Sequence, residues 1–231
     1  MDNRLKIAVL NVATGKYINF IDPLYECISK YFFVDHDVDC FLFTDSDREF
    51  NGAKKYKIDR KGFPGDTLYR YHYFLLAEDK LKNYDFLFYL DVDMDIVDFI
   101  DEKIVHDMLA VYHPGFYKKH NGTFERRSNC QAFLPSNVTG PYFCGGVQGG
   151  KPEHYLKACH AIKKAIDLDN KNNITAVWHD ESHWNAYLHK NKPNLKVLSP
   201  RYCYYPFKWL LDMEKQAKIV ALDKDHEEIR A

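Results

Sequence analysis

The chain has 231 residues, of which 46% are hydrophobic and 28% charged, a composition typical of globular proteins. Its 32 Lys and Arg nearly balance its 33 Asp and Glu, and the net charge of −1 argues against a nucleic-acid-binding protein, which needs a basic surface. No apolar run approaches the roughly 18 residues of a membrane-spanning helix. The six cysteines are scattered without a CxxC pair, and no signal peptide is recognisable, so we expect a reduced, cytoplasmic protein.

The hydrophobic pattern predicts an α/β fold. In chain order, the expected elements are a strand at 6–12, a helix at 21–33, a strand at 38–44, a loop with at most one short strand at 45–65, a helix at 67–82, strands at 85–90 and 108–112, a loop-rich segment at 113–152, helices at 153–167 and 178–189, and a strand at 195–198. The first strand, helix and strand have the spacing of a βαβ unit, which predicts a parallel sheet. Asp66 is expected to cap the helix at 67–82.

An acidic segment follows the most apolar strand, and residues 86–98 read FLFYLDVDMDIVD. In open α/β sheets, ligands bind beyond the carboxyl ends of the strands. Asp91 and Asp93 could there coordinate a hard divalent cation, which in turn holds a diphosphate. The alternative is a solvated acidic turn. A calcium-binding loop fits worse, because Ile96 stands where that loop needs Gly and a strand, not a helix, precedes it.

Residues 178–183 read WHDESH. His179 and His183 have the spacing of a zinc-protease helix, but Asp180 stands where that motif requires Glu. Two adjacent carboxylates beside a Trp suit sugar chemistry better, because one can face an oxocarbenium ion while the other binds hydroxyls. The alternative is a helix start at which Asp180 and Glu181 only complement the helix dipole.

Two further segments contain glycines. Residues 142–150 read YFCGGVQGG, and such Gly pairs allow close approach of a ligand but serve bends equally well. Residues 12–17 read VATGKY, in which Tyr17 replaces the Ser or Thr of a phosphate-binding P-loop and the upstream Gly is absent. A P-loop is therefore excluded.

Taken together, these segments resemble the family 6 glycosyltransferases, which include the blood-group A and B transferases, α1,3-galactosyltransferase and their bacterial homologues. The segments that carry the resemblance follow the family's order over nearly the whole chain: VATGKY (12–17), LFTD (42–45), DVD (91–93), HPGFY (113–117), FERR (124–127), YFCGGVQGG (142–150), AVWHDESHWNAYL (176–188), NKPNLKVLSPRY (191–202) and ALDKDHEEIR (221–230). The resemblance implies a GT-A fold, a single Rossmann-like nucleotide-sugar-binding domain over 1–231 with a mixed central sheet. It also implies that the tail at 207–231 is a lid over the donor diphosphate.

The same resemblance implies roles for individual residues. The implied donor-binding residues are Val12, Ala13, Thr14, Tyr17, Arg70, Asp91, Asp93, Gly145, Gly146, His179, Asp180, Lys224 and Arg230. Asp91 and Asp93 would bind Mn²⁺, or Mg²⁺ or Co²⁺ in its place. His113 and Trp178 would contact the acceptor galactose. Glu181 matches the catalytic Glu and would also face the acceptor.

The expected activity is retaining transfer of GalNAc from UDP-GalNAc to the 3-hydroxyl of galactose in a fucosylated acceptor, Fucα1,2-Gal. Gly146 favours GalNAc, because in the blood-group enzymes a small residue at this place leaves room for the N-acetyl group. The acceptor segment departs from the family, because Tyr204-Tyr205-Pro206 stands where the family carries an acidic contact. The alternatives are an α1,3-galactosyltransferase that uses UDP-Gal and a non-catalytic sugar- or calcium-binding module. The intact Glu181 argues against the module.

Overall fold

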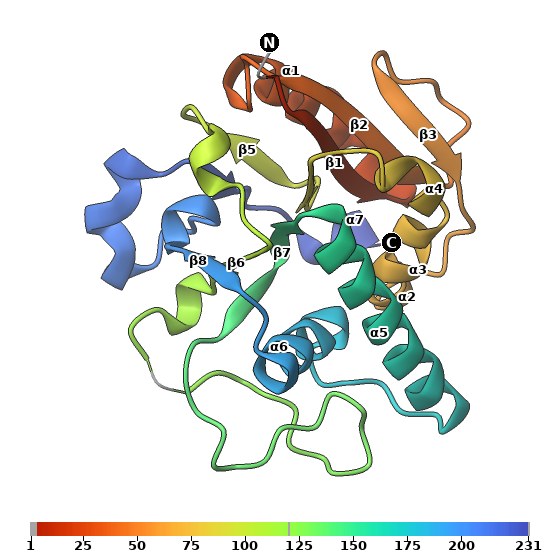
Figure 1. The fold of residues 1–231 in the computed structure, drawn as a ribbon, viewed down its shortest axis with the longest axis vertical. Coiled ribbons are helices and arrows are strands. Elements are labelled where there is room, and N and C mark those ends of the chain that lie inside the picture. Colours follow the sequence, from red (N-terminus) through yellow and green to blue (C-terminus); the bar gives the residue numbers. More distant parts are fainter. Residues whose placement is uncertain (1–3, 120, 231) are drawn as a thin grey trace.

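The computed structural model describes residues 4–119 and 121–230. Its centre is a seven-stranded sheet with the order β3-β2-β1-β4-β7-β6-β8 (Figure 1). The strands are β1 (Lys6–Ala13), β2 (Asp37–Thr44), β3 (Ala53–Lys57), β4 (Phe86–Leu90), β6 (Met108–Tyr112), β7 (Phe143–Gly150) and β8 (Leu195–Leu198). Strand β7 runs antiparallel to both of its neighbours, whereas the other pairs are parallel. The expected α/β fold with a mixed sheet is confirmed.

Helices cover both faces of this sheet. They are α1 (Ile21–Tyr31), α2 (Gly65–Leu68), α3 (Arg70–Leu75), α4 (Glu78–Leu81), α5 (Pro152–Lys171), α6 (His179–Asn191) and α7 (His226–Arg230). Alternate residues of β1 enter two separate apolar clusters: Ile7 joins the cluster that contains α1, and Ala8 joins the cluster that contains α3, α5 and α6. Strands buried on both faces are apolar throughout, which is why β4 was predicted from its sequence.

Short 3₁₀ helices and one additional strand pair complete the fold. The 3₁₀ helices are η1 (Gly15–Phe20), η2 (Glu102–Ile104), η3 (Pro114–Phe116), η4 (Pro200–Tyr202) and η5 (Lys208–Gln216). Strand β5 (Met94–Ile96) pairs antiparallel with β9 (Ile219–Ala221), so the C-terminal segment is joined to the chain directly after the DVD motif.

The prediction of a loop-rich segment at 113–152 is wrong for Phe143–Gly150, because β7 lies there between β4 and β6. This strand, FCGGVQGG, was missed because Gly is rare in strand interiors. The neighbouring strands require it: a Cβ at Gly149 would lie 2.7 Å from the Leu87 carbonyl oxygen, and one at Gly150 would lie 2.5 Å from that of Asp107.

The predicted helix at 67–82 is also wrong in one respect, because it is divided into α2, α3 and α4. The backbone leaves helical geometry at Tyr69, where ψ is 7°. The break leaves the Thr67 carbonyl free to accept a hydrogen bond from Arg70 Nε at 3.2 Å. Asp66 does not cap α2; its carboxylate accepts a hydrogen bond from the Lys61 amide instead.

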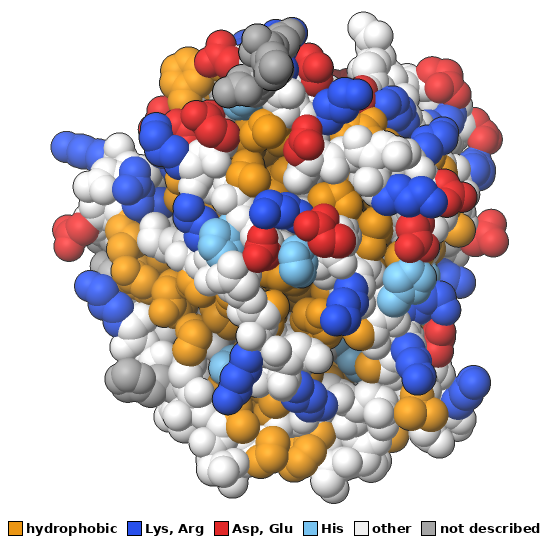
Figure 2. Space-filling model, in the orientation of Figure 1, with side chains coloured by type: hydrophobic (Ala, Val, Ile, Leu, Met, Phe, Trp, Pro, Cys, Tyr) orange, Lys and Arg blue, Asp and Glu red, His pale blue; other side chains and the backbone are white. Residues whose placement is uncertain are grey.

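On the face shown in Figure 2, Lys and Arg side chains are interspersed with Asp and Glu rather than gathered in one patch. Across residues 4–119 and 121–230, no helix is both long enough and apolar enough to cross a membrane.

Candidate active site

A cavity of about 280 Å³ opens beyond the carboxyl ends of β1 and β4. Most of the predicted donor-binding residues line it, namely Val12, Thr14, Tyr17, Arg70, Asp91, Asp93, Lys224 and Arg230. They come from segments far apart in the chain, so the cavity forms only when β1, β4, α3 and the C-terminal segment come together. Ala13 does not line it, because this residue is buried within the sheet.

The sequence analysis missed several lining residues, which are Arg60, Phe63, Asp66, Thr67, Tyr89, Val92, His226 and Ile229. Four of them belong to the polar loop and short helix between β3 and α3. Their sequence contains no motif, and only their position in space reveals them. The turn signals at Gly62 and Pro64 marked this segment as a loop, but nothing in them indicated that it forms one wall of a pocket.

Asp91 and Asp93 directly follow β4. Asp91 accepts a hydrogen bond from the Tyr89 hydroxyl and lies 3.4 Å from an Arg70 guanidinium nitrogen. Asp93 forms an ion pair with Lys224 from the C-terminal segment. The side chain of Asp91 is 31% exposed and that of Asp93 is 12% exposed, so both remain accessible from the cavity. Carboxylate oxygens of this kind fit Mn²⁺ or Mg²⁺, which are hard cations.

Arg70 lies buried beneath these carboxylates and joins three elements. Its guanidinium stacks on the Tyr89 ring, with Cζ 4.4 Å from the ring centroid. One nitrogen donates to the Gly145 carbonyl at 2.8 Å, and Nε lies 3.2 Å from Asp180 Oδ2. Because Arg70 touches both Asp91 and Asp180, it offsets part of the negative charge that the site concentrates.

The adjacent carboxyl groups of Asp180 and Glu181 lie in the first turn of α6. Burial raises the pKa of each group to about 7. Glu181 Oε2 accepts a hydrogen bond from the Gly145 amide at 2.8 Å, and this bond opposes the upward shift of its pKa. Among the described residues, none donates a hydrogen bond to Asp180 Oδ2. Carboxyl groups with such raised pKa values are typical of catalytic sites.

The glycines of β7 have a steric role here. A Cβ at Gly145 would lie 3.2 Å from both Asp180 Oδ2 and Glu181 Cβ. A Cβ at Gly146 would lie 2.6 Å from Asp91 Oδ2 and 2.9 Å from Met94 Cε. Both glycines therefore let β7 approach the carboxylates: Gly145 lies against Asp180 and Glu181, and Gly146 lies against Asp91. The structure thus places Gly145 and Gly146 beside the cavity rather than in its lining.

The C-terminal segment forms one wall of the cavity. The Arg230 guanidinium lies over the Phe63 ring, 3.7 Å from its centroid. Lys16 Nζ donates to the Glu228 carbonyl at 2.8 Å, which ties α7 to η1. The Lys224 ammonium lies 5.6 Å from the centre of the Tyr17 ring. These contacts bring positive charge opposite the carboxylates that follow β4.

The predicted acceptor residues lie outside this cavity. His113 is largely buried; its Nδ1 accepts a hydrogen bond from the Gly115 amide, and burial lowers its pKa to about 4, so the ring is neutral. Trp178 precedes α6 and is 48% exposed. His179 and Asp180, which were predicted to bind the donor, do not line the cavity either. His179 packs edge-on against Phe63, with 5.2 Å between the ring centroids, and burial together with Arg230 lowers its pKa.

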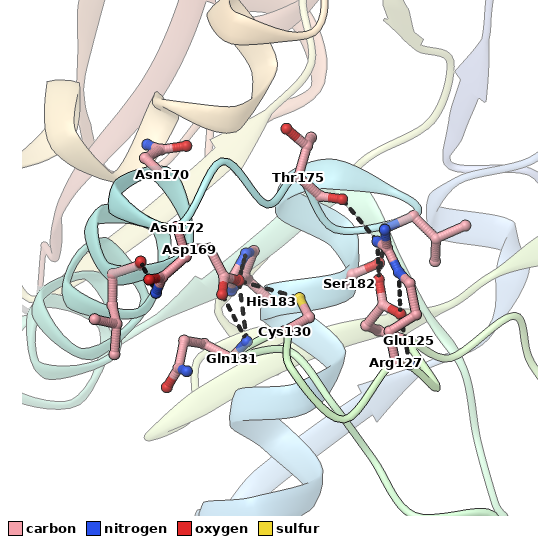
Figure 3. Close-up of polar contacts among 12 residues, drawn as sticks. Glu125, Arg127, Cys130, Gln131, Asp169, Asn170, Asn172, Thr175, Ser182 and His183 are labelled. Carbon is pink, nitrogen blue, oxygen red and sulfur yellow. Dashed lines mark hydrogen bonds and ion pairs between the residues drawn. The ribbon is translucent and has the colours of Figure 1, made fainter.

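A second cluster lies on the other side of α6 (Figure 3). The side chains of Cys130, Asp169 and His183 are buried, and their potential ligand atoms lie within 4.8 Å of one another. Such a set could hold a metal ion, and its sulfur and imidazole suit zinc better than manganese. As described, Cys130 Sγ donates to Asp169 Oδ2 at 3.0 Å, and His183 Nε2 lies 3.5 Å from the same oxygen. The sequence analysis missed it, because the three residues have no motif spacing.

The chain is similar to known glycosyltransferases along most of its length. The model of glycosyltransferase family 6 matches residues 74–231. Histo-blood group ABO system transferase 1 of Rattus norvegicus is 33% identical over 94% of this chain and 66% of its own length. O-antigen biosynthesis glycosyltransferase WbnI of Escherichia coli is 31% identical over 96% of both chains. Globoside alpha-1,3-N-acetylgalactosaminyltransferase 1 of Gallus gallus is 29% identical over 100% of this chain and 71% of its own length.

The chain thus spans slightly less than two thirds of the rat protein and almost the whole of the bacterial one. The family match covers the DVD motif and the C-terminal segment, which line the cavity, and also β7 and α6, whereas the lining residues from Val12 to Arg70 precede it. The protein belongs to glycosyltransferase family 6 and is a glycosyltransferase of the GT-A fold.

Proposed function

We propose that the protein is a retaining α1,3-N-acetylgalactosaminyltransferase that moves GalNAc from UDP-GalNAc to the 3-hydroxyl of galactose in a Fucα1,2-Gal acceptor and depends on Mn²⁺. One observation carries the proposal: a single cavity combines Asp91 and Asp93 with Lys224 and Arg230. A nucleoside diphosphate held through a divalent cation needs this combination of acidic and basic groups. The name of the chicken relative, an alpha-1,3-N-acetylgalactosaminyltransferase, supports GalNAc as the sugar, and the name of the rat relative supports a role in histo-blood group synthesis.

Asp91 and Asp93 are the proposed ligands of Mn²⁺, with Mg²⁺ or Co²⁺ as replacements. The bound cation supplies positive charge beside the departing diphosphate. Lys224 and Arg230 supply more from the opposite wall. Since Lys224 contacts Asp93 in the structure, its ammonium must share or leave this carboxylate when a cation binds there.

Tyr17 and Thr14 are the proposed contacts of the uridine, with Val12 beneath them at the end of β1. The proposed lid is shorter than the tail at 207–231, because β9 is hydrogen bonded to β5 and the Leu222 amide donates to the Asp93 carbonyl. We therefore assign the lid to residues 223–230, which include α7. A lid of this kind excludes water from the activated donor.

Glu181 is the proposed catalytic residue. When ionised, it faces the anomeric carbon, either as a nucleophile or as the carboxylate that stabilises an oxocarbenium ion during front-face transfer. The Gly145 amide orients it. Asp180 is proposed to lie along the donor sugar, with its Oδ2 held by the ion pair with Arg70. The exposed ring of Trp178 offers the acceptor galactose an apolar surface, with His113 and Glu181 as its polar contacts.

A matrix of UDP-sugars and acceptors, assayed with Mn²⁺ or with EDTA, tests the proposal. We expect fastest transfer from UDP-GalNAc to Fucα1,2-Gal and loss of transfer in EDTA. A preference for UDP-Gal would favour the galactosyltransferase, which is the alternative that the family allows. Transfer to unfucosylated lactose alone would contradict the proposed acceptor, and absence of any UDP release would favour a sugar-binding module.

The Gly146→Ala variant tests the choice of donor. We expect the ratio of UDP-GalNAc to UDP-Gal turnover to fall. The new Cβ would also press on Asp91 Oδ2, so the apparent affinity for Mn²⁺ should be measured in the same experiment. Gly52→Ala is a control for the loss of a glycine alone, since a Cβ there meets no heavy atom within 4 Å and the site lies outside the cavity, although its φ of +78° costs some stability.

A further inference from the structure

Strand β7 is longer than its neighbour β4, so the residues of β7 before Gly146 have no β4 residues opposite them. The last pair of residues between the two strands is Leu90 and Val147, and one further bond joins the Asp91 amide to the Gly146 carbonyl at 2.9 Å. On the β6 side, the Tyr142 carbonyl accepts a hydrogen bond from His113. Since main-chain groups of successive residues point to opposite sides, those of Phe143 face the side where β4 has ended.

Helix α6 replaces the missing strand at this edge. Asn185 Oδ1 accepts a hydrogen bond from the Phe143 amide at 2.9 Å, and Asn185 Nδ2 donates to the Phe143 carbonyl at 2.8 Å. The side-chain amide therefore forms both bonds that a neighbouring strand would form. Two residues further along β7, the Gly145 amide donates to Glu181.

The spacing of these two contacts is set by backbone geometry. Glu181 and Asn185 are four residues apart on a helix, a rise of about 6 Å. Phe143 and Gly145 are two residues apart on a strand, a rise of about 6.6 Å. The two side chains therefore reach equivalent positions on β7. Asn185 Nδ2 also lies 2.9 Å from the Glu181 carbonyl and donates to it, which links the two contacts directly.

We propose that Asn185 is a positioning residue for the transfer reaction: it sets the register of α6 on β7 and thereby holds the Glu181 carboxylate on the Gly145 amide. This inference rests on the proposed role of Glu181. Asn185 is only 1% exposed, so water cannot easily replace its amide. Asn and Gln offer a donor and an acceptor on the two adjacent atoms of one planar amide, and the longer Gln would shift α6 away from β7.

The test is a double-mutant cycle between Asn185→Ala and Glu181→Gln, measured after circular dichroism has shown that each variant is folded. We expect Asn185→Ala to lower kcat about 10- to 100-fold, as for a small misplacement of a catalytic group. KM for UDP-GalNAc should change by less than about 3-fold, because the donor cavity is lined by other residues. In the Glu181→Gln background, Asn185→Ala should have almost no further effect on kcat.

Asn191→Ala is the matched control, because Asn191 lies on the same helix and donates to the Tyr187 carbonyl four residues earlier but is exposed. Its kcat should equal that of the wild type. If Asn185→Ala does not fold, Asn185→Ser serves in its place. Additive effects of the two substitutions on kcat, or an unchanged kcat of the folded Asn185 variant, would overturn this inference but not the proposed function. A normal kcat of Glu181→Gln would overturn the proposed function and the inference with it.

Discussion

The two sides of α6 are bordered by buried carboxylates with opposite properties. On one side, burial raises the pKa of Glu181 to about 7, although Tyr142 and the Gly145 amide oppose the shift as hydrogen-bond donors. On the other side, Arg127 lowers the pKa of Glu125 to about 2 (Figure 3). Glu125 accepts hydrogen bonds from the Arg127 side chain and amide and from the Val177 amide. Burial is the largest cause of the raised pKa of Glu181, whereas the hydrogen bond from Arg127 is the largest cause of the lowered pKa of Glu125.

The opposite pKa shifts indicate different roles: Glu125 stabilises the structure, whereas Glu181 remains available for chemistry. Glu125 has its lone pairs occupied and ties the loop at 121–142 to the segment before α6. Asp169 is similarly occupied, by Cys130 and the Gln131 amide. Asp180 and Glu181 instead have raised pKa values, which is typical of carboxyl groups that take part in chemistry.

The largest effect is expected for Glu181→Gln, which should lower kcat about 10³-fold, because an uncharged amide cannot stabilise positive charge at the anomeric carbon. Product formation from UDP-GalNAc measures it. Glu153→Gln is the control, since Glu153 also lies in the first turn of a helix but is exposed. Equal loss in the two variants would contradict a catalytic role that is specific to Glu181.

Removal of the cation is expected to have the second largest effect. EDTA should lower the rate of transfer about 100-fold, and added Mn²⁺ should restore it. Asp93→Asn should raise the Mn²⁺ concentration required. Cys130→Ser should not, because the cluster of Cys130, Asp169 and His183 lies away from the cavity. A Cys130→Ser enzyme that no longer responds to Mn²⁺ would move the functional cation to that cluster.

Glu125→Gln is expected to act on stability rather than on chemistry. It removes the charge that the Arg127 side chain and two amides share, and should lower the free energy of unfolding by about 2 kcal/mol. Urea unfolding followed by circular dichroism measures this, and kcat at a temperature where the variant is folded should remain within about 3-fold of the wild type. Glu102→Gln, an exposed carboxylate that pairs with His36, provides the matched surface change.

The smallest effect concerns pH, and its sign differs between the two carboxylates. Because the pKa of Glu181 is raised in the folded state, its contribution to stability is present below about pH 4.3 and is lost as pH rises through 7. The pKa of Glu125 is lowered, so its contribution is present above about pH 4.3 and is lost as pH falls through 2. Melting temperatures of Glu181→Gln and Glu125→Gln across this range should therefore deviate from the wild type at opposite ends.

Activity should follow the Glu181 titration in the other direction, since the ionised carboxylate is the reactive form: kcat/KM should fall as pH drops below about 7. A flat profile between about pH 5 and 8 would contradict the assignment of the raised pKa to the catalytic group.

Local patterns predicted most of the sheet and the main helices. The apolar run of β4 is visible in the sequence because both faces of this strand are buried. The same reasoning does not predict strand β7. Its glycines are required because carbonyl groups of other segments, such as that of Leu87 beside Gly149, leave no room for a Cβ. The breaks between α2, α3 and α4 were missed for a similar reason, since the hydrogen bond from Arg70 to Thr67 accompanies the break at Tyr69.

By itself, the sequence determined that Asp91 and Asp93 follow a buried strand and that Asp180 and Glu181 share one turn of a helix, because strand burial and helix periodicity are local properties. Only the tertiary structure decided that Lys224 meets Asp93, that Arg70 joins Asp91 to Asp180, and that Asn185 pairs with β7. It also decided which carboxylates titrate near neutrality. A pKa depends on burial and on charged partners, and these come from residues far apart in the chain.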